Sequence, residues 1–175
     1  MMRALVVYES MFGNTGQVAR AVADGIAEHM AVDVVTVTEA PAPLEELVDL
    51  VVVGGPTHAF SMTRHNTRED AVRQGAHADP ATGIREWLDR LHTGPHSEAV
   101  ATFDTRVAKV KHLPGSAAKA AAKVLRREGY SHAVTGPESF WVEDVPGPLL
   151  DGELDRAREW GRGLARSVAA AATAS

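Results

Sequence analysis

Short apolar runs alternate with longer amphipathic stretches along the chain. The apolar runs cover residues 4–8, 32–37, 49–55, 99–103 and 133–142. Runs this short and this apolar are typical of parallel strands whose two faces are both covered. The pattern therefore predicts five strands, and the unbroken run at residues 50–53 is expected in the centre of the sheet.

The stretches between these runs show helical spacing. Val18, Val22, Ile26 and Met30 recur every four residues and place one apolar face on a helix. The predicted helices cover residues 15–30, 84–91, 116–128 and 154–168, with a weaker one at 68–74. Strands that alternate with helices in this way predict βα units and a doubly wound α/β fold.

The length of the chain indicates one domain. At 175 residues it is long enough to bury one ordinary core and short for two. Neither a repeat nor a linker divides it, so a single domain over residues 1–175 is expected. The alanine-rich end, residues 169–175, is expected to be a frayed tail.

The composition excludes several kinds of chemistry. The chain has no cysteine, which removes disulfides, thiolate nucleophiles and cysteine-ligated metals, so a redox role has to use a bound organic cofactor. The net charge of -5 argues against nucleic-acid binding. No apolar run reaches the roughly 18 residues of a membrane span, and we expect a cytoplasmic protein without one.

The loop after the first strand has the residues of an anion site. Ser10, Asn14 and Thr15 lie where the next helix begins and its N–H groups are unpaired. The loop has no lysine in the position that a Walker loop requires, and its glycines do not match the dinucleotide-binding fingerprint. An anion bound here would be held by backbone dipoles and hydroxyl groups.

The residues of this loop, from Tyr8 through Glu9-Ser10-Met11-Phe12-Gly13-Asn14 to Thr15, resemble the phosphate loop of flavodoxins and flavodoxin-like quinone reductases. The resemblance extends to Gly54-Gly55-Pro56-Thr57 after the third strand and covers essentially the whole chain. It implies a flavodoxin-like, doubly wound five-stranded parallel sheet of order 2-1-3-4-5, with FMN at the carboxyl ends of strands 1, 3 and 4.

The resemblance also implies the residues that hold the cofactor. They come from the connections after the first, third and fourth strands. They are Ser10, Met11, Phe12, Gly13, Asn14 and Thr15; Pro56, Thr57, His58, Ala59, Phe60 and Ser61; and Phe103, Asp104, Thr105 and Arg106.

Three of the four phenylalanines, Phe12, Phe60 and Phe103, fall in or beside these connections. They are expected to converge on one crevice, where a flat flavin ring would pack against them. The chain lacks the tryptophan and the tyrosine that many flavodoxins stack on the two faces of the ring, and His58 or Phe60 would have to replace them. The loop after Pro56 also lacks glycine, which is expected to make positive φ angles unfavourable.

A basic run follows the fourth strand, with Arg106, Lys109, Lys111 and His112. Flavodoxins tend to be neutral or acidic here. The bland interpretation is a solvated surface. If Arg106 lies near the ring, its charge favours the anionic reduced flavin and raises the reduction potential.

Other sites receive little support. The eight histidines are scattered without a repeated ligand spacing, so no metal site is predicted. The chain has no G-x-S-x-G nucleophile elbow, and Gly54-Gly55 stands where a phosphorelay receiver would need an aspartate.

Three functions remain open. The first is an FMN-binding, flavodoxin-like electron-transfer protein that serves redox partner proteins, with the flavin doing the chemistry and no catalytic side chain assigned. The second is an FMN-dependent NAD(P)H:quinone or protoporphyrinogen-type oxidoreductase, and the third a flavin-free interaction domain. A carrier is favoured over a self-sufficient enzyme.

Overall fold

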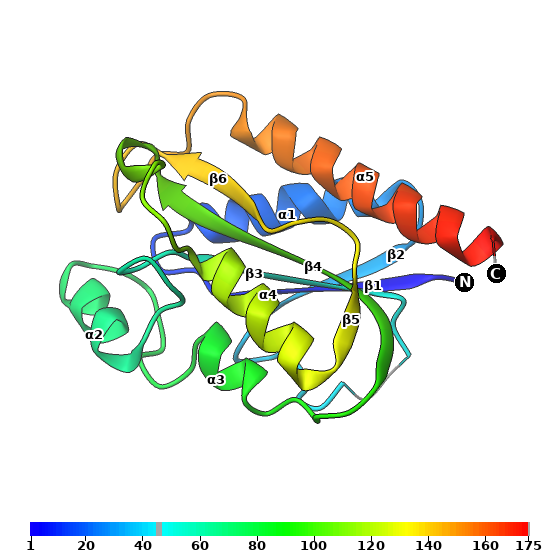
Figure 1. Ribbon diagram of the computed structural model, residues 1–175. Coiled ribbons are helices and arrows are strands. Elements are labelled where there is room, and N and C mark those ends of the chain that lie inside the picture. Colours follow the sequence, from blue (N-terminus) through cyan, green and yellow to red (C-terminus); the bar gives the residue numbers. More distant parts are fainter. Residues whose placement is uncertain (45–46, 175) are drawn as a thin grey trace.

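The structure is a computed structural model that describes residues 1–44 and 47–174. Its parallel sheet has the order β2-β1-β3-β4-β5, and a sixth strand, β6, pairs with β4 beyond the end of β5 (Figure 1). The strands are β1 (Arg3–Tyr8), β2 (Ala31–Thr36), β3 (Leu50–Pro56), β4 (His96–Val107), β5 (Tyr130–Ala133) and β6 (Glu138–Val142). The predicted doubly wound sheet of order 2-1-3-4-5 is confirmed.

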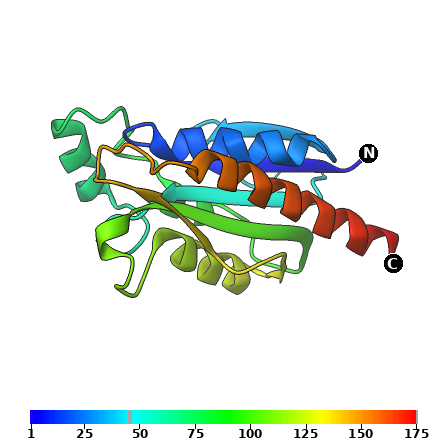
Figure 2. The same cartoon turned by 90° about the horizontal axis from the view of Figure 1, so that it is seen from above.

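Helices cover both faces of the sheet (Figure 2). They are α1 (Asn14–Ala27), α2 (His65–Arg73), α3 (Ile84–Leu88), α4 (Ala117–Glu128) and α5 (Glu153–Thr173), with a short 3₁₀ turn, η1 (Ala108–Val110). One core lies between the sheet and α1 and α5, and a second lies between the sheet and α3 and α4. Among the described residues, no helix is long and apolar enough to cross a membrane.

The fourth and fifth strands differ from the prediction. β4 runs from His96 to Val107 and so includes residues that were expected in the following loop. The predicted fifth strand is two strands, because Gly136-Pro137 interrupts it and proline cannot donate to the ladder. β5 pairs with the first half of β4 and β6 with its second half, so the two pieces extend one edge of the sheet.

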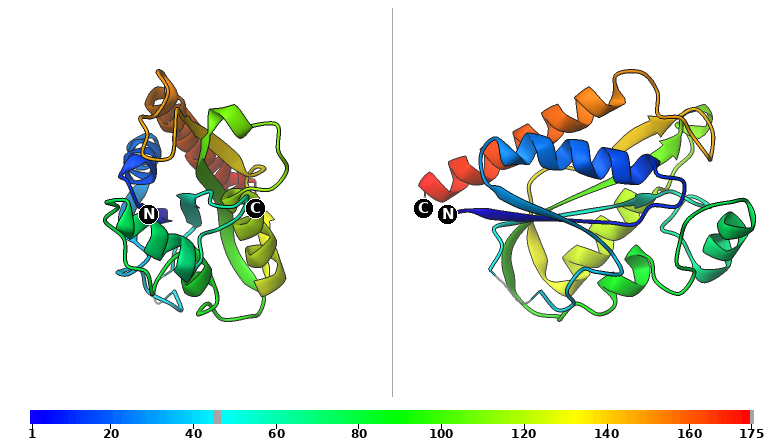
Figure 3. Two further views of the ribbon diagram at one scale, coloured as in Figure 1. Left: turned by 90° about the vertical axis from the view of Figure 1, so that its left-hand side faces the viewer. Right: turned by 180° about the vertical axis from the view of Figure 1, so that it is seen from behind.

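The helix ends also differ. The expected frayed tail is wrong for residues 169–173, because α5 continues to Thr173; Ser175 lies outside the described residues. The buried Ala165 and Val168 anchor the second half of this helix on the sheet. Figure 3 shows both termini at the end of the sheet opposite the loops that follow β1, β3 and β4.

Candidate cofactor-binding site

The loop after β1 forms a cradle of backbone N–H donors. Gly13, with φ 94°, is the N-cap of α1 and supplies no side-chain cap. Within the described chain the amide N–H groups of residues 11–15 donate to no acceptor, whereas Gly16 N–H donates to Ser10 Oγ at 3.2 Å. These unpaired N–H groups lie at the positive end of the α1 dipole, an arrangement that favours an anion.

Side chains at the start of α1 fasten this cradle to the sheet. Thr15 Oγ1 and Thr105 Oγ1 lie 2.7 Å apart in a buried hydrogen bond that joins α1 to β4. Asn14 is also buried. Its amide fills the space beside Gly147, where a Cβ atom would lie 2.7 Å from Asn14 Oδ1. The loop is therefore held from two sides.

The loop after β3 forms a tight turn. His58 and Ser61 exchange backbone hydrogen bonds of 3.0 and 3.1 Å, and the intervening Ala59 and Phe60 have φ angles of 47° and 62°. The expectation that this loop avoids positive φ without glycine is therefore wrong. The pair of hydrogen bonds outweighs a local strain of about 1–2 kcal/mol per residue.

This turn packs against the loop that follows β4. A Cβ atom on Gly115 would lie 2.7 Å from the carbonyl oxygen of Phe60, so only glycine lets the two loops approach so closely. The Phe60 ring itself is half exposed. His58 is more enclosed, and its burial lowers the pKa of the imidazole, which is therefore neutral at pH 7.

Phe103 does not reach the crevice. Its ring is 1 % exposed and packs edge-on against Phe140 and Trp160 in the core beneath α5. Gly54 lies directly beside this ring, and a Cβ atom there would clash with it. The prediction that Phe103 lines a flavin site is wrong, because alternation along β4 turns this side chain to the α1 and α5 face.

Asp104 and Arg106 point to the other face of the sheet, and both are buried strand residues. Asp104 Oδ2 accepts from Ala118 N at 3.0 Å, at the beginning of α4, while its Oδ1 has no partner among the described residues. Burial is the largest influence on this carboxyl group and raises its pKa. The group serves as a cap for α4 beneath the crevice.

Arg106 holds the basic turn that follows β4 through hydrogen bonds. Its Nη2 donates to the carbonyl oxygens of Leu113 at 2.5 Å and Val110 at 3.4 Å, and its guanidinium carbon lies 6.0 Å from the centre of the Trp141 ring. The Nε atom is buried without a partner among the described residues. Arg106 is thus a structural anchor, and it also lines the crevice.

The crevice is a cavity of about 160 Å³ between these three connections. It unites ten of the sixteen residues expected at the site: Met11, Phe12, Asn14, Thr15, Pro56, Thr57, His58, Ala59, Thr105 and Arg106. Ser10 and Gly13 lie on the other side of the loop, whereas Phe60, Ser61, Phe103 and Asp104 do not line the crevice. Val107, Val142 and Val145 complete the lining and were missed. Val107 lies at the end of β4, which runs four residues beyond its predicted end, and the pairing of β6 with β4 brings Val142 and Val145 there.

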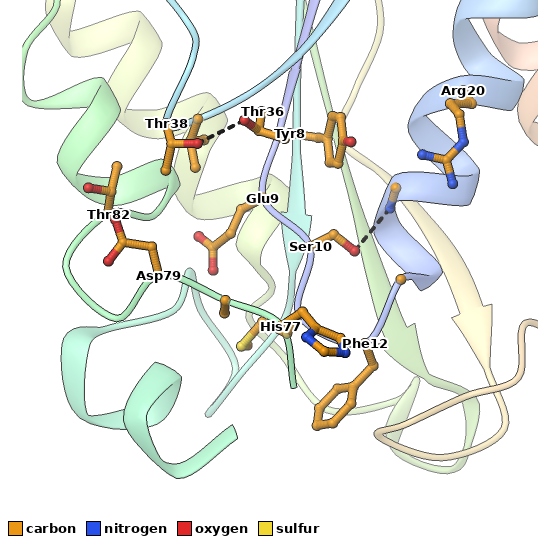
Figure 4. Close-up of a pocket in the computed structure, with 15 residues that line it drawn as sticks. Tyr8, Glu9, Ser10, Phe12, Arg20, Thr36, Thr38, His77, Asp79 and Thr82 are labelled. Carbon is orange, nitrogen blue, oxygen red and sulfur yellow. Dashed lines mark hydrogen bonds between the residues drawn. The ribbon is translucent and has the colours of Figure 1, made fainter. Parts of the chain in front are cut away.

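A larger cavity, of about 650 Å³, lies on the β2 side of the same loop (Figure 4). Tyr8, Thr36 and Thr38 form one wall, and His77 lies beside Phe12 at the opposite end of the cavity in this view. Arg20 reaches back toward the loop, so that a Cβ atom on Gly16 would lie 3.4 Å from its Nη1. A positive charge therefore lies nearer to the cradle than the sequence suggested.

Beneath the loop lies a buried polar network that the sequence did not reveal. Thr63 Oγ1 lies 2.6 and 2.8 Å from the two carboxylate oxygens of Glu9, which also accepts from Ile84 N at 2.8 Å. The fully buried Arg68 donates to Thr63 and to Glu86, both at 2.9 Å. Burial, the largest influence, raises the pKa of Glu9. The network ties α2 and α3 to the end of β1.

Comparisons with known proteins agree with this architecture. The family model described as flavodoxin matches residues 6–79. No curated protein sequence gives a significant match. A flavodoxin from the domain Archaea is 19 % identical, with a TM-score of 0.64 over 96 % of this chain and 99 % of that one. Oxidised flavodoxin 1 from Bacillus cereus is 16 % identical, with a TM-score of 0.65 over 94 % and 97 %.

A longer protein contains the same fold. Rubredoxin oxygen:oxidoreductase from Desulfovibrio gigas is 16 % identical, with a TM-score of 0.62, and the match covers 96 % of this chain but 36 % of that one. At such identities the structural likeness shows the shared fold. The chain therefore has a flavodoxin-like fold: its sheet order is 2-1-3-4-5, and the flavodoxin family model matches residues 6–79.

Proposed function

We propose that the protein binds FMN and passes electrons between partner proteins. The observation that carries this proposal is the run of five unpaired amide N–H groups, at residues 11–15, that opens beside a crevice at the ends of β3 and β4. The bound flavin would supply the redox chemistry, and the chain would supply binding, orientation and electrostatics.

The cradle suits a phosphate monoester. Unpaired N–H groups, the α1 dipole and the nearby guanidinium of Arg20 all favour an anion. Each hydrogen bond to a charged acceptor contributes about 1.5–3 kcal/mol. Because the side chains of Thr15 and Ser10 already take part in internal hydrogen bonds, the backbone provides most of this binding.

The crevice suits a flat apolar ring with one adjustment. Met11, Phe12 and Val142 provide apolar surface, and the neutral imidazole of His58 can stack without adding charge. Its 160 Å³ is below the roughly 300 Å³ of ordinary cofactor sites. Ring binding therefore requires the turn at His58–Ser61 to move away from Gly115. Arg106, at one edge, would favour a reduced anionic flavin.

A second candidate is an FMN-dependent NAD(P)H:quinone oxidoreductase. The cavity of about 650 Å³ across the loop favours it, because it offers room for another ligand beside the cofactor. NADPH oxidation by the FMN-loaded protein with a soluble quinone distinguishes the two functions. Rapid turnover identifies the enzyme, and its absence supports the carrier.

Titration with FMN and with riboflavin, followed by quenching of flavin fluorescence, tests the binding proposal. We expect FMN to bind more than about tenfold more tightly, because riboflavin leaves the amides of the cradle unpaired. Ser10→Asp places a negative charge in the loop and should weaken FMN binding about tenfold without affecting riboflavin. Ser131→Asp, on the exposed part of β5, is the matched control.

Two results would contradict the proposal. Equal affinities for FMN and riboflavin would mean that the loop does not hold the phosphate. Absence of any flavin binding would remove the redox role altogether and leave the chain as an interaction domain.

A further inference from the structure

An exposed cationic stripe follows the crevice along α4. It consists of Lys109 and Lys111 in the turn after β4 and Lys119, Lys123 and Arg126 on α4. All five residues are exposed, and none forms an ion pair in the part of the chain that the structure describes. Between Thr105 and Arg127 the sequence has no acidic residue.

The stripe contains all four lysines of the protein, since every other basic side chain is an arginine. A lysine ammonium is a mobile, strongly hydrated point charge, whereas an arginine forms fixed bidentate pairs. Lysines therefore suit a surface that attracts a partner by long-range electrostatics and then releases it. A compositional preference for arginine does not account for four lysines within fifteen consecutive residues.

Helix α5 shows how this chain balances charge elsewhere. There Arg156 pairs with Glu153 at 2.7 Å, and Arg158 pairs with Asp155 at 3.4 Å. Arg162 pairs at 2.6 Å with Glu28, the C-cap residue of α1. The stripe has no such compensation, although the chain as a whole carries a net charge of -5.

The lysines of the stripe also lower the stability of the helix that carries them. Lys119 lies in the first turn of α4, which has no acidic residue, so its charge opposes the helix dipole. Lys119 and Lys123 form a like-charged pair four residues apart, which costs a few tenths of a kcal/mol more. Arg126 near the C-terminus is favourable to the dipole, but the two lysines serve no stabilising role within the helix.

The fold connects the stripe to the candidate cofactor site. Arg106 lines the crevice and, through its bonds to Val110 and Leu113, holds the turn that carries Lys109 and Lys111. From there α4 leads away along one face of the sheet (Figure 1). A groove of about 610 Å³ lies beside it, lined on the helix side by Lys119, Lys123 and Arg126.

We propose that this cationic stripe docks an electron-transfer protein with an acidic surface. The inference rests on the proposed function, because it names the partner of the same site. Charge complementarity selects the partner: an uncompensated positive face on a negatively charged protein orients an acidic protein so that its redox centre meets the crevice. The twelve residues of α4 span about 18 Å, a length that fits a protein interface of standard size.

Charged small oxidants test the local field first. The FMN-loaded, reduced protein is mixed with ferricyanide or with hexaammineruthenium(III) at rising ionic strength. If only the net charge mattered, added salt would accelerate the oxidation of the protein by ferricyanide, because two negative charges repel each other. The stripe predicts the opposite, a rate that falls with added salt, because the local field dominates within a Debye length of about 10 Å. Lys119→Glu with Lys123→Glu should lower the low-salt ferricyanide rate about fivefold and reverse its salt dependence.

The matched control is Arg73→Glu with Arg166→Glu. It changes the net charge by the same amount at exposed positions on α2 and α5, and it should change the rate less than about twofold. Equal effects of the two double variants would overturn the proposal, since only the net charge would then matter. A ferricyanide rate that salt accelerates in the wild-type protein would overturn it as well.

A measurement that does not depend on flavin separates this proposal from the function on which it rests. Fluorescence anisotropy follows a labelled, oxidised plant-type [2Fe–2S] ferredoxin as the acidic probe, at about 20 mM ionic strength. Binding that the Lys119/Lys123 variant weakens about tenfold supports the docking surface even if FMN fails to bind. Absence of ferredoxin binding would contradict the docking surface. So would a DNA duplex that binds more tightly than ferredoxin and is weakened equally by the Lys119/Lys123 substitutions.

Discussion

Asp104 and Glu9 are buried carboxyl groups beneath the loops of the candidate site, and each is used to hold backbone in place. Asp104 accepts from the first turn of α4, and Glu9 accepts from the first turn of α3. Burial raises the pKa of both groups. Neither residue lines the crevice, although Glu9 lines the larger cavity on the β2 side of the loop. Their hydrogen bonds hold the beginnings of α3 and α4 in place.

Asp104 makes the stability of the protein dependent on pH. As pH rises above the ordinary pKa of 3.8, the unfolded chain releases this proton before the folded protein does, so stability falls until the raised folded pKa is passed. Asp104→Asn removes this loss and keeps an acceptor for Ala118 N. Urea unfolding from about pH 4 to 8 should show the variant gaining stability relative to the wild type across that window. A constant difference would contradict a raised pKa.

Arg68 is expected to be the most sensitive arginine of α2. It is fully buried and bonds Thr63, Glu86 and the carbonyl oxygen of Pro80. Arg68→Ala should lower the free energy of unfolding by about 3 kcal/mol, at the lower end for broken buried pairs because Glu86 is partly exposed. Urea denaturation measures the loss. Arg73→Ala on the same helix removes only an exposed pair and should cost under about 0.5 kcal/mol.

Helices α1 and α5 pack closely against each other. Glycines on both helices allow it, because a Cβ atom on Gly25 would collide with the carbonyl oxygen of Arg158 and one on Gly161 with that of Val22. This close packing buries Val22, Ile26 and their neighbours against the sheet. It also positions the beginning of α1, where the candidate phosphate cradle lies.

Two glycines of α5 should respond to the same substitution in opposite ways. Gly161→Ala forces the helices apart and should destabilise the protein by about 2–3 kcal/mol. Gly163→Ala has open space around it and should stabilise the protein by up to about 1 kcal/mol, because alanine is the better helix former. Thermal unfolding of both variants provides the comparison, and equal effects would exclude close packing as the cause.

At the scale of the whole molecule, the loops of the candidate site gather at one end of the sheet. The carboxyl ends of β1, β3 and β4 meet there, and the termini lie at the other end (Figures 1 and 3). A ligand in the crevice would contact segments from residue 11 to residue 145. Binding there is therefore coupled to global folding.

FMN should stabilise the whole protein through this coupling. At a free concentration about one hundred times its Kd, a ligand of the folded state adds about 2.7 kcal/mol, which raises the Tm of a protein of this size by roughly 5–10 °C. Differential scanning calorimetry with and without FMN measures the shift. Riboflavin at the same concentration should give a smaller one, and no shift with either flavin would contradict a flavin site.

The sequence by itself determined the fold and most of its elements, and it predicts an anion-binding loop after β1. Unbroken apolar runs such as residues 50–53 indicate parallel strands that are buried on both faces, and this pattern is local in the sequence. The candidate anion cradle can be proposed from the sequence because it depends on neighbouring residues at one strand-to-helix turn. The helix over 15–30 was correct within three residues at its end.

Tertiary structure decided which side chains reach the crevice. Phe103 is an internal residue of β4, which extends to Val107, and the alternation of side chains along the strand turns its ring to the core. There it packs beside Gly54, a residue from a distant segment of the sequence. The turn that contains Ala59 and Phe60 packs closely against Gly115, and Arg68 meets Glu9 and Thr63 only in the folded protein. Local periodicity encodes elements, whereas such contacts depend on how remote segments pack, which no local pattern specifies.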